Sequence, residues 1–306
     1  MITKSFEIFS GTGGVGKTTL ACARAIEIAR QKKKVLLITI DPAKRLKELM
    51  KTSGGKYIAP QHVEGVPIRE RLFEQVAVIA DAPCDTSAWS LPVLPVDQLA
   101  ERVSEIAGKY FAHPSQAMRL IGITGTNGKT SVATFARQIW QALGLAAVNL
   151  GTTGVEGDWQ APLSHTTPEP ITLHRMLAGA AQNGITHAAM EASSHGLAQR
   201  RLDGVQLKAA GFTNFSQDHL DYHATFEEYF DAKMGLFRRV LPEDGTAVIN
   251  IDDPKSDDVA EIALSRGQTL LRVGRAEKAD LRITGQRYDA TGQEVLFSYP
   301  GRARSV

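Results

Sequence analysis

The sequence predicts an α/β fold built around a mostly parallel sheet. From Arg119 onward, segments of strand character and helix character alternate, and most of the strand segments are short apolar runs. Two glycine-rich loops, at residues 11–18 and 124–131, each stand between a predicted strand and a predicted helix. Alternation of this kind implies parallel strands with helices covering both faces of the sheet.

The N-terminal part of the chain opens with a βαβ pattern followed by a turn-rich junction at residues 52–56. After that junction we expect two short strands and one amphipathic helix, and the pair His113-Pro114 then interrupts the chain. The predicted elements are strand 5–9, helix 17–32, strand 35–40, strand 76–80, strand 91–96 and helix 97–110.

The remaining chain is predicted to form a central domain of the P-loop ATPase type, preceded by partial α/β segments. Its expected strands are 119–123, 146–149, 186–190, 209–213 and 246–250, its helices are 129–143, 170–182 and 225–239, and residues 281–298 have hairpin character. We therefore predict three parts: residues 1–56, a partial P-loop βαβ segment; residues 57–115; and residues 116–306, the central domain.

Composition argues against several classes of function. The 306 residues include 35 basic and 33 acidic ones, so the formal charge is only +2 and no broad field attracts nucleic acid or a membrane. The two cysteines, Cys22 and Cys84, supply neither a disulfide framework nor a metal-ligand spacing. No apolar run reaches the roughly 18 residues of a membrane span, and no signal peptide is apparent. These features favour a cytoplasmic protein.

The first phosphate loop, residues 11–18, is a full match to the pattern G-x-x-x-x-G-K-[ST]. Glycines allow backbone N–H groups to turn toward phosphate oxygens, the lysine neutralises charge, and the following hydroxyl can hold Mg²⁺. A tight glycine turn without a ligand is the alternative. The candidate residues are Gly11, Gly13, Gly14, Gly16, Lys17, Thr18 and Thr19.

The second phosphate loop, residues 124–131, has the same strand–loop–helix context, although Ile123 stands where the full pattern has its first glycine. Here Lys129 would face the outer phosphates and Thr130 a magnesium ion. A turn capped by threonine and asparagine is the alternative. The candidate residues are Gly125, Thr126, Asn127, Gly128, Lys129, Thr130 and Ser131.

Three further features have open interpretations. Glu191 follows a predicted strand and could reach the ligand crevice as a magnesium ligand, but a surface carboxylate is equally compatible with its position. The stretch 213–223 contains Asp218, His219 and other polar groups, and could serve metal binding, acid–base chemistry or, slightly favoured, a helix cap. Lys233 lies on the next predicted helix, where a solvated lysine is the default expectation.

Taken together, these motifs resemble those of a known family. From about residue 65 to residue 306 the sequence resembles the Mur ligases, and within them the MurE group, which adds a diamino acid to UDP-MurNAc-L-Ala-D-Glu. The matching segments are Gly-Thr-Asn-Gly-Lys-Thr at 125–130, Thr166-Thr167-Pro168, Met190 to Leu197, Gln199-Arg-Arg201, Asn214 to His223, and Ala232-Lys233.

The resemblance implies a peptidoglycan-precursor ligase that uses ATP and Mg²⁺, with UDP-MurNAc-dipeptide and a diamino acid as small-molecule substrates. We also expect a monomer, and the weak net charge argues against nucleic-acid or membrane partners. Catalysis would involve Lys129, Glu191, His219 and Lys233, and the metal would be held by Thr130, Glu191, His219 and a carbamoylated Lys233. The positions that would grip the UDP-dipeptide are Thr166, Thr167, Ser193, Gln199 and Arg201.

The resemblance also sets expectations about the rest of the chain. Residues 57–115 would be a remnant of the UDP-binding N-terminal domain, and the family's C-terminal domain would be absent. Residues 1 to about 50 resemble the arsenite-pump and MinD-like ATPases, in which Thr18 would hold magnesium and Asp41 would lie beside the attacking water. Two alternatives therefore remain: a MinD-like ATPase that uses Lys17, and a fusion fragment that binds nucleotide without turnover.

Overall fold

The computed structural model describes residues 36–38, 77–82, 93–216, 222–289, 292–299 and 302–305. The chain divides into two compact units, Met1–Ala100 and Glu101–Val306. The first phosphate loop and the predicted helix 17–32 lie outside the described residues. The three-part division predicted from the sequence stays a prediction.

The first unit contains a parallel sheet of three described strands in the order β1-β2-β3. These are β1 (Leu36–Ile38), β2 (Ala77–Ala82) and β3 (Val93–Asp97). Each falls on a strand predicted from the sequence, at 35–40, 76–80 and 91–96.

The second unit is organised around a sheet whose ten described strands run in the order β13-β12-β11-β10-β9-β8-β4-β7-β5-β6. Neighbouring strands from β11 through to β5 pair in parallel, whereas β6 pairs antiparallel with β5 at one edge, and β12 pairs antiparallel with both β11 and β13 at the other. The mostly parallel α/β fold predicted from the sequence is thereby confirmed. The bounds are β4 (Arg119–Thr124), β5 (Ala147–Gly151), β6 (Gly154–Gly157), β7 (His187–Glu191), β8 (Ala209–Phe212), β9 (Thr246–Asn250), β10 (Thr269–Gly274), β11 (Leu281–Asp289), β12 (Gly292–Tyr299) and β13 (Arg302–Ser305).

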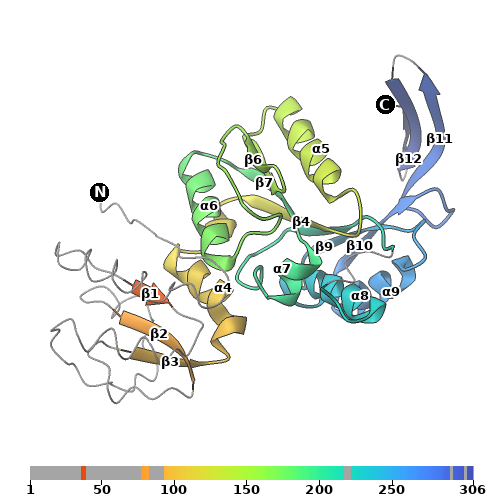
Figure 1. Ribbon diagram of the computed structural model, residues 1–306. Coiled ribbons are helices and arrows are strands. Elements are labelled where there is room, and N and C mark those ends of the chain that lie inside the picture. The colour runs from red at the N-terminus through yellow and green to blue at the C-terminus, as the bar shows by residue number, and fades with distance from the viewer. Residues whose placement is uncertain are drawn as a thin grey trace. The chain divides into compact units, whose positions relative to one another are not determined.

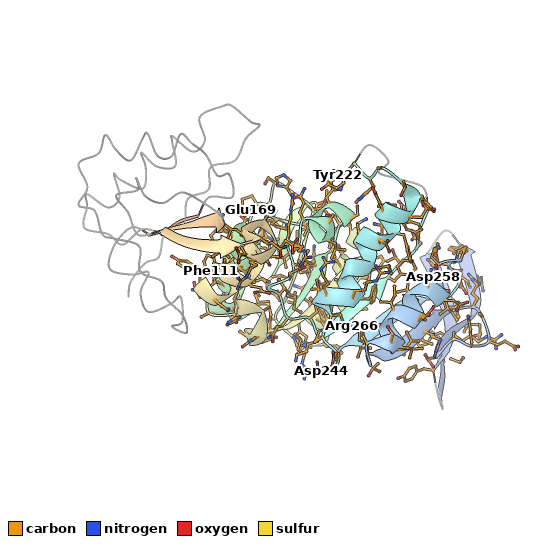
Figure 2. All side chains as sticks on the ribbon, turned by 90° about the horizontal axis from the view of Figure 1, so that it is seen from below. Phe111, Glu169, Tyr222, Asp244, Asp258 and Arg266 are labelled. Atoms are coloured by element: carbon orange, nitrogen blue, oxygen red, sulfur yellow. The ribbon has the colours of Figure 1, made fainter. Side chains whose placement is uncertain are left out.

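Helices α4, α5 and α6 begin and end within two residues of their predicted bounds, and α6 matches its prediction, whereas η1, α7 and α9 were not predicted. Its N-terminus is capped by Glu169, labelled in Figure 2, whose carboxylate accepts hydrogen bonds from the backbone N–H groups of Ile171 and Thr172. The bounds are α4 (Leu99–Tyr110), η1 (Pro114–Ala117), α5 (Lys129–Ala142), α6 (Pro170–Gln182), α7 (Ser194–Ala198), α8 (Phe226–Gly235), η2 (Leu236–Val240) and α9 (Ser256–Ser265).

The predicted helix 225–239 is confirmed over Phe226–Gly235, which form α8, and from Leu236 onward the chain continues as a π-helical turn, η2, in place of the expected α-helix. In this arrangement the Arg239 guanidinium lies against Gly235, where an added Cβ would come within 2.7 Å of it. It donates a 2.9 Å hydrogen bond to the carbonyl oxygen of Leu197. Through this hydrogen bond of Arg239, the π-helical turn η2 contacts α7.

Figure 1 shows α5 and α6 beside the sheet that contains β4 and β7. Successive side chains of a strand point to opposite faces of the sheet, so each of these strands contributes to two packing layers. On one face, Ile123 and Ala189 pack with Ala133 of α5. On the other face, Leu120 and Met190 belong to the larger core, together with residues of α6, α8, η2 and α9. Across the described residues, no helix is long and apolar enough to cross a membrane.

The parallel strands place several loops at one edge of the sheet. Strand β4 lies between β7 and β8, and β7 in turn pairs with β5. Because all four strands run in the same direction, the residues that follow them converge at their carboxyl ends, where ligands of open α/β sheets bind.

Candidate functional site

The second phosphate loop connects β4 to α5 and requires glycine at two positions. Gly125 has a φ of 142°, and an added Cβ would lie 2.0 Å from Oγ1 of Thr213. Gly128, at the start of α5, has a φ of 85°. Side chains at these positions would be strained, so the glycines let the backbone turn at the amino terminus of α5.

Residues that follow β8 hold this loop in place. Asn214 accepts hydrogen bonds from the backbone N–H groups of Thr126, at 2.8 Å through its carbonyl, and of Asn127, at 3.0 Å through its side chain. Its side-chain amide donates back to the carbonyl oxygen of Asn127 at 3.0 Å. The loop conformation therefore depends on a segment almost 90 residues further along the chain.

Two lysines converge on the start of the loop. Lys129 Nζ donates to the carbonyl oxygens of Gly125 and Thr126, at 3.0 and 2.8 Å. Lys233 Nζ donates to the same Gly125 oxygen at 2.8 Å and lies 4.3 Å from the centre of the Tyr229 ring. Lys233 is only 1% exposed, so the expectation of a solvated lysine is wrong: packing of α8 against the sheet buries it.

Glu191 is also buried, at 2% exposed, which excludes a surface role. It ends β7, and its Oε1 accepts a 3.0 Å hydrogen bond from the backbone N–H of Thr152, which follows the neighbouring strand β5. An added Cβ at Gly151 would lie only 1.9 Å from that oxygen. The carboxylate is therefore accommodated by a glycine at the end of β5.

The predicted substrate residues form a connected polar group next to Glu191. Thr167 Oγ1 donates to the Glu191 carbonyl and accepts from the Ser193 backbone N–H, both at 2.9 Å. Arg201 donates to the Thr167 carbonyl at 2.5 Å and twice to Gln199 Oε1. Burial lowers the pKa of the Arg201 guanidinium from its ordinary value, while nearby Glu169 raises it.

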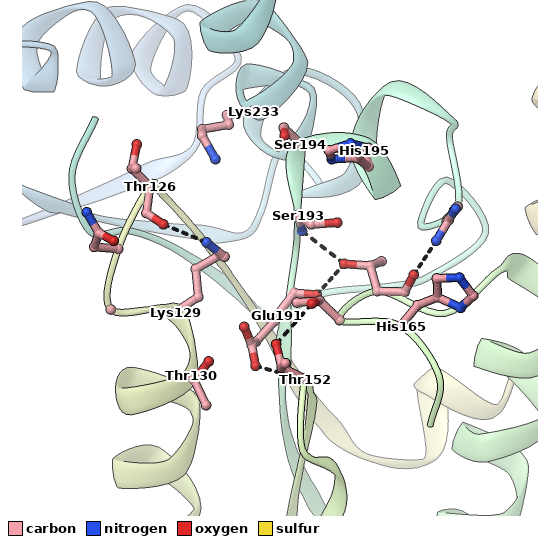
Figure 3. A pocket seen from close by; sticks show the side chains of 15 residues that line it. Thr126, Lys129, Thr130, Thr152, His165, Glu191, Ser193, Ser194, His195 and Lys233 are labelled. Carbon is pink, nitrogen blue, oxygen red and sulfur yellow. Dashed lines mark hydrogen bonds between the residues drawn. The ribbon is translucent and has the colours of Figure 1, made fainter. Parts of the chain in front are cut away.

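These groups surround one pocket with a volume of about 490 Å³ (Figure 3). Its lining includes the predicted residues Lys129, Glu191 and Lys233, whereas the predicted residues Gly125, Ser131 and Gln199 do not line it. The described residues that line it are Thr126, Asn127, Gly128, Lys129, Thr130, Thr152, His165, Thr166, Thr167, Glu191, Ser193, Ser194, His195, Arg201 and Lys233.

Sequence reasoning missed four of these lining residues: Thr152, His165, Ser194 and His195. Thr152 could have been found, because it follows a predicted parallel strand whose carboxyl end lies at the ligand edge. Ser194 and His195 belonged to a recognised motif but had no assigned role.

The stretch 213–223 has a mixed outcome. Asp218 and His219 lie outside the described residues, so the predicted metal role of His219 stays a prediction. The favoured helix-cap interpretation is wrong for α8, since its N-cap is Thr225, whose side chain accepts from the Glu228 backbone N–H at 3.1 Å. Phe215 and His223, by contrast, are buried in the core beside Tyr229.

The donor set suits phosphate and a hard divalent cation. Among the described residues, no group of three or more histidine, cysteine, aspartate and glutamate side chains could form a protein-only metal site. Magnesium usually takes one or two carboxylates and completes its shell with phosphate and water. Glu191, next to Thr130 in the same pocket, fits that requirement.

A glycine-rich phosphate loop between a parallel strand and a helix, with a buried carboxylate at the end of the adjacent strand, defines a P-loop-type α/β protein. Residues 123–306 match the Mur ligase middle domain. The chain belongs to the Mur ligase family, which confirms the resemblance seen in the sequence. Residues 4–64 separately match the anion-transporting ATPase family.

Two similar curated proteins are each named UDP-N-acetylmuramoyl-L-alanyl-D-glutamate–2,6-diaminopimelate ligase. The protein of Chelativorans sp. (strain BNC1) is 47% identical over 201 residues, which is 65% of this chain and 41% of that protein. The protein of Bradyrhizobium diazoefficiens is 38% identical over 256 residues, or 82% of this chain and 50% of that protein. This chain thus spans at most about half the length of these relatives.

Solved structures support the same fold. A structure of a UDP-N-acetylmuramoyl-L-alanyl-D-glutamate–2,6-diaminopimelate ligase has a TM-score of 0.68 at 25% identity, covering 90% of this chain and 53% of that one. A Mycobacterium tuberculosis folylpolyglutamate synthase complexed with ADP and AMPPCP has a TM-score of 0.54 at 18% identity, covering 67% and 53%. The latter likeness concerns the fold alone.

Proposed function

We propose that this chain binds ATP at residues 125–131 and uses it to activate a carboxylate of UDP-MurNAc-L-Ala-D-Glu for amide formation with a diamino acid. The observation that carries the proposal is the convergence of Lys129, Glu191, Arg201 and Lys233 on one pocket beside the phosphate loop. The names of the curated relatives support 2,6-diaminopimelate as the acceptor.

The reaction has two steps. A carboxylate oxygen of the dipeptide attacks the γ-phosphorus of ATP, giving an acyl phosphate and ADP. The amine of the diamino acid then attacks the acyl carbon, and inorganic phosphate leaves. Both steps move negative charge, so catalysis depends on positioning the reactants and neutralising the phosphoryl oxygens.

Lys129 is the residue best placed for neutralisation. Its ammonium donates to two carbonyl oxygens of its own loop, at 3.0 and 2.8 Å, and therefore lies beside the loop that would bind the phosphates. A phosphate that entered the loop would offer a stronger, charged acceptor than those carbonyls. Lys129 would then transfer its hydrogen bonds to the phosphate.

Magnesium would be held by Thr130 and Glu191, with His219 and a carbamoylated Lys233 as further ligands. When bound, it would neutralise charge on the ATP phosphates. The Thr152 hydrogen bond fixes one carboxylate oxygen of Glu191 and so orients the group. The buried position of Lys233 keeps its amine close to the loop, 2.8 Å from the Gly125 carbonyl oxygen.

The dipeptide would bind in the part of the pocket that is lined by Thr167 and Arg201. Arg201 offers a planar guanidinium for an anionic substrate, and Gln199 together with the Thr167 carbonyl holds it in position. Thr166, Thr167 and Ser193 supply neighbouring polar contacts. We expect the protein to act as a cytoplasmic monomer on these small molecules. The nucleotide-binding role of Lys17, Thr18 and the rest of the first phosphate loop stays a prediction.

The test is calorimetric binding of ATP with Mg²⁺ to the wild type, Lys129→Ala and the matched variant Lys17→Ala, each with and without UDP-MurNAc-L-Ala-D-Glu. We expect Lys129→Ala to weaken ATP binding at least tenfold and to abolish substrate-stimulated phosphate release, because it removes a charged hydrogen bond to phosphate. Lys17→Ala should leave the substrate-stimulated release intact. The reverse pattern would refute the proposal and favour an ATPase based on the first phosphate loop.

A further inference from the structure

The hydroxyl of Ser194 is buried in the wall of the pocket without a hydrogen-bond partner. Ser194 is 1% exposed, and among the described residues its Oγ makes no hydrogen bond. It nevertheless belongs to the residues that line the pocket. Buried side-chain hydroxyls in folded proteins almost always have a partner, so this exception requires an explanation.

Five other hydroxyl side chains that line the pocket make hydrogen bonds within the protein. Thr126 bonds to the backbone of Ser216, and Thr167 bonds to the backbone on either side of residue 192. Ser193, the residue next to Ser194, caps α7 by accepting from the Gly196 backbone N–H at 3.1 Å. The hydroxyl groups of Thr152 and Thr166 pair with each other at 2.9 Å.

The fold holds Ser194 in this position. An added Cβ at Gly196 would lie 2.6 Å from the Thr167 side chain, so the backbone of α7 is pressed closely against the pocket wall. Helix α7 also packs against α8, the helix that carries Lys233. Figure 3 shows Ser194 among the labelled side chains of Lys233, His195 and Ser193.

The charge of the pocket indicates what the missing partner is. Three cationic side chains, Lys129, Arg201 and Lys233, line it together with a single carboxylate, Glu191, which suits an anionic ligand. A serine hydroxyl donates readily to an anionic oxygen, and such a bond is stronger than one between neutral groups.

We propose that the Ser194 hydroxyl donates a hydrogen bond to an anionic oxygen that enters this pocket. That oxygen has three chemical sources: a phosphoryl group of ATP, a carboxylate of the UDP-dipeptide, or a carbamate formed when the Lys233 amine adds to carbon dioxide. In the last case the nitrogen–carbon bond forms as the amine loses a proton to solvent. The inference rests on the proposed function and adds a binding residue to it.

The experiment compares the wild type with Ser194→Ala and with Ser194→Cys, which replaces the hydroxyl by a somewhat larger thiol, a weaker hydrogen-bond donor. Three probes identify the source: calorimetry with ATP and Mg²⁺, calorimetry with UDP-MurNAc-L-Ala-D-Glu, and the carbamate resonance in ¹³C NMR with ¹³C-bicarbonate. We expect both variants to weaken one of the three on the order of tenfold, the loss of one charged hydrogen bond. The probe whose signal is weakened identifies the source of the anionic oxygen.

Thermal unfolding of the ligand-free proteins supplies a second readout. Ser194→Ala should melt at the wild-type temperature or above it, because it removes a polar atom that had no partner. Ser256→Ala is the matched control, since Ser256 is similarly buried on α9 and its hydroxyl donates to the Ile251 carbonyl at 3.4 Å. It should melt lower and leave all three probes unchanged.

The outcomes separate the inference from the proposed function. Wild-type binding that Lys129→Ala weakens, with no effect of either Ser194 variant, would overturn the inference alone. Wild-type affinity in Ser194→Cys but not in Ser194→Ala would overturn it too, since shape and not hydrogen bonding would then matter. A wild type that binds none of the probes would overturn both.

Discussion

The carboxylate of Glu191 occupies the space that a side chain at Gly151 would fill. The two residues end adjacent parallel strands, β7 and β5, and a Cβ at residue 151 would lie 1.9 Å from Oε1 of Glu191. The same oxygen accepts its hydrogen bond from Thr152, the residue after Gly151. The position of the proposed metal-binding carboxylate is therefore fixed by a glycine 40 residues earlier in the chain.

Gly151→Ala should displace the Glu191 carboxylate and lower the Mg²⁺-dependent affinity for ATP about tenfold, since the displaced group loses its fixed orientation. Overpacking of this kind also costs about 1–3 kcal/mol of stability. Calorimetry with and without Mg²⁺ and chemical denaturation measure the two effects. Gly211→Ala on β8 is the control, because its nearest neighbour would lie at an ordinary 3.8 Å. Equal effects of both variants would contradict a specific role of Gly151.

Arg201→Lys should weaken binding of UDP-MurNAc-L-Ala-D-Glu by about 1.5–3 kcal/mol while leaving ATP affinity nearly intact. A lysine cannot reproduce the planar fork that bonds simultaneously to Gln199 and the Thr167 carbonyl. Calorimetric titration with each ligand measures the change. Unaltered affinity for the UDP-dipeptide would remove Arg201 from the substrate site.

Lys233 should show a carbamate resonance in ¹³C NMR when ¹³C-bicarbonate is added, and Lys233→Arg should abolish that resonance. The lysine is 1% exposed and directed at the phosphate loop, where a carbamate would supply oxygen ligands for Mg²⁺. Lys255→Arg, which alters a lysine that pairs with Asp258 on α9, is the control and should retain the resonance. Persistence of the resonance in Lys233→Arg would assign the carbamate to another amine.

Acidification should destabilise the second unit through His174. Burial is the main cause that lowers the pKa of His174 to about 4, and nearby His113 adds to it. Its ring lies 3.4 Å from the Ser104 hydroxyl. Since the unfolded chain binds a proton near the ordinary value of about 6.5, stability is full above that pH and falls as the pH drops toward 4.

The loss attributable to His174 should reach about 3 kcal/mol at most, the equivalent of the pKa difference. Urea unfolding of the wild type and His174→Gln between pH 6.5 and 5 measures it, and the variant should show a shallower pH dependence. His165→Gln, which alters an exposed histidine, should keep the wild-type slope. Parallel pH profiles for wild type and His174→Gln would contradict the assignment.

Local sequence determined much of the framework of this protein. The apolar run Leu120–Ile123 and the following Gly125 to Lys129 specify a strand, a tight turn and a helix, because only glycine adopts the required backbone conformations of the turn without strain. The spacing of apolar residues and the capping residues likewise determined the bounds of α6, which begins after Glu169 with a proline in its first turn. Helix α9 has Asp257 and Asp258 in its first turn, a signal that was present in the sequence but not used.

Contacts between distant segments of the chain decided which side chains are buried at the candidate site. The sequence left Glu191 and Lys233 as plausible surface groups, since the burial of a side chain depends on which elements pack over it. The sheet order places β7 and β8 on either side of β4, and this brings Glu191 and the segment before Lys233 to the phosphate loop. The Ser194 hydroxyl is similar: it is buried without a partner on α7, a helix that packs closely against Thr167, and no local pattern specifies that environment.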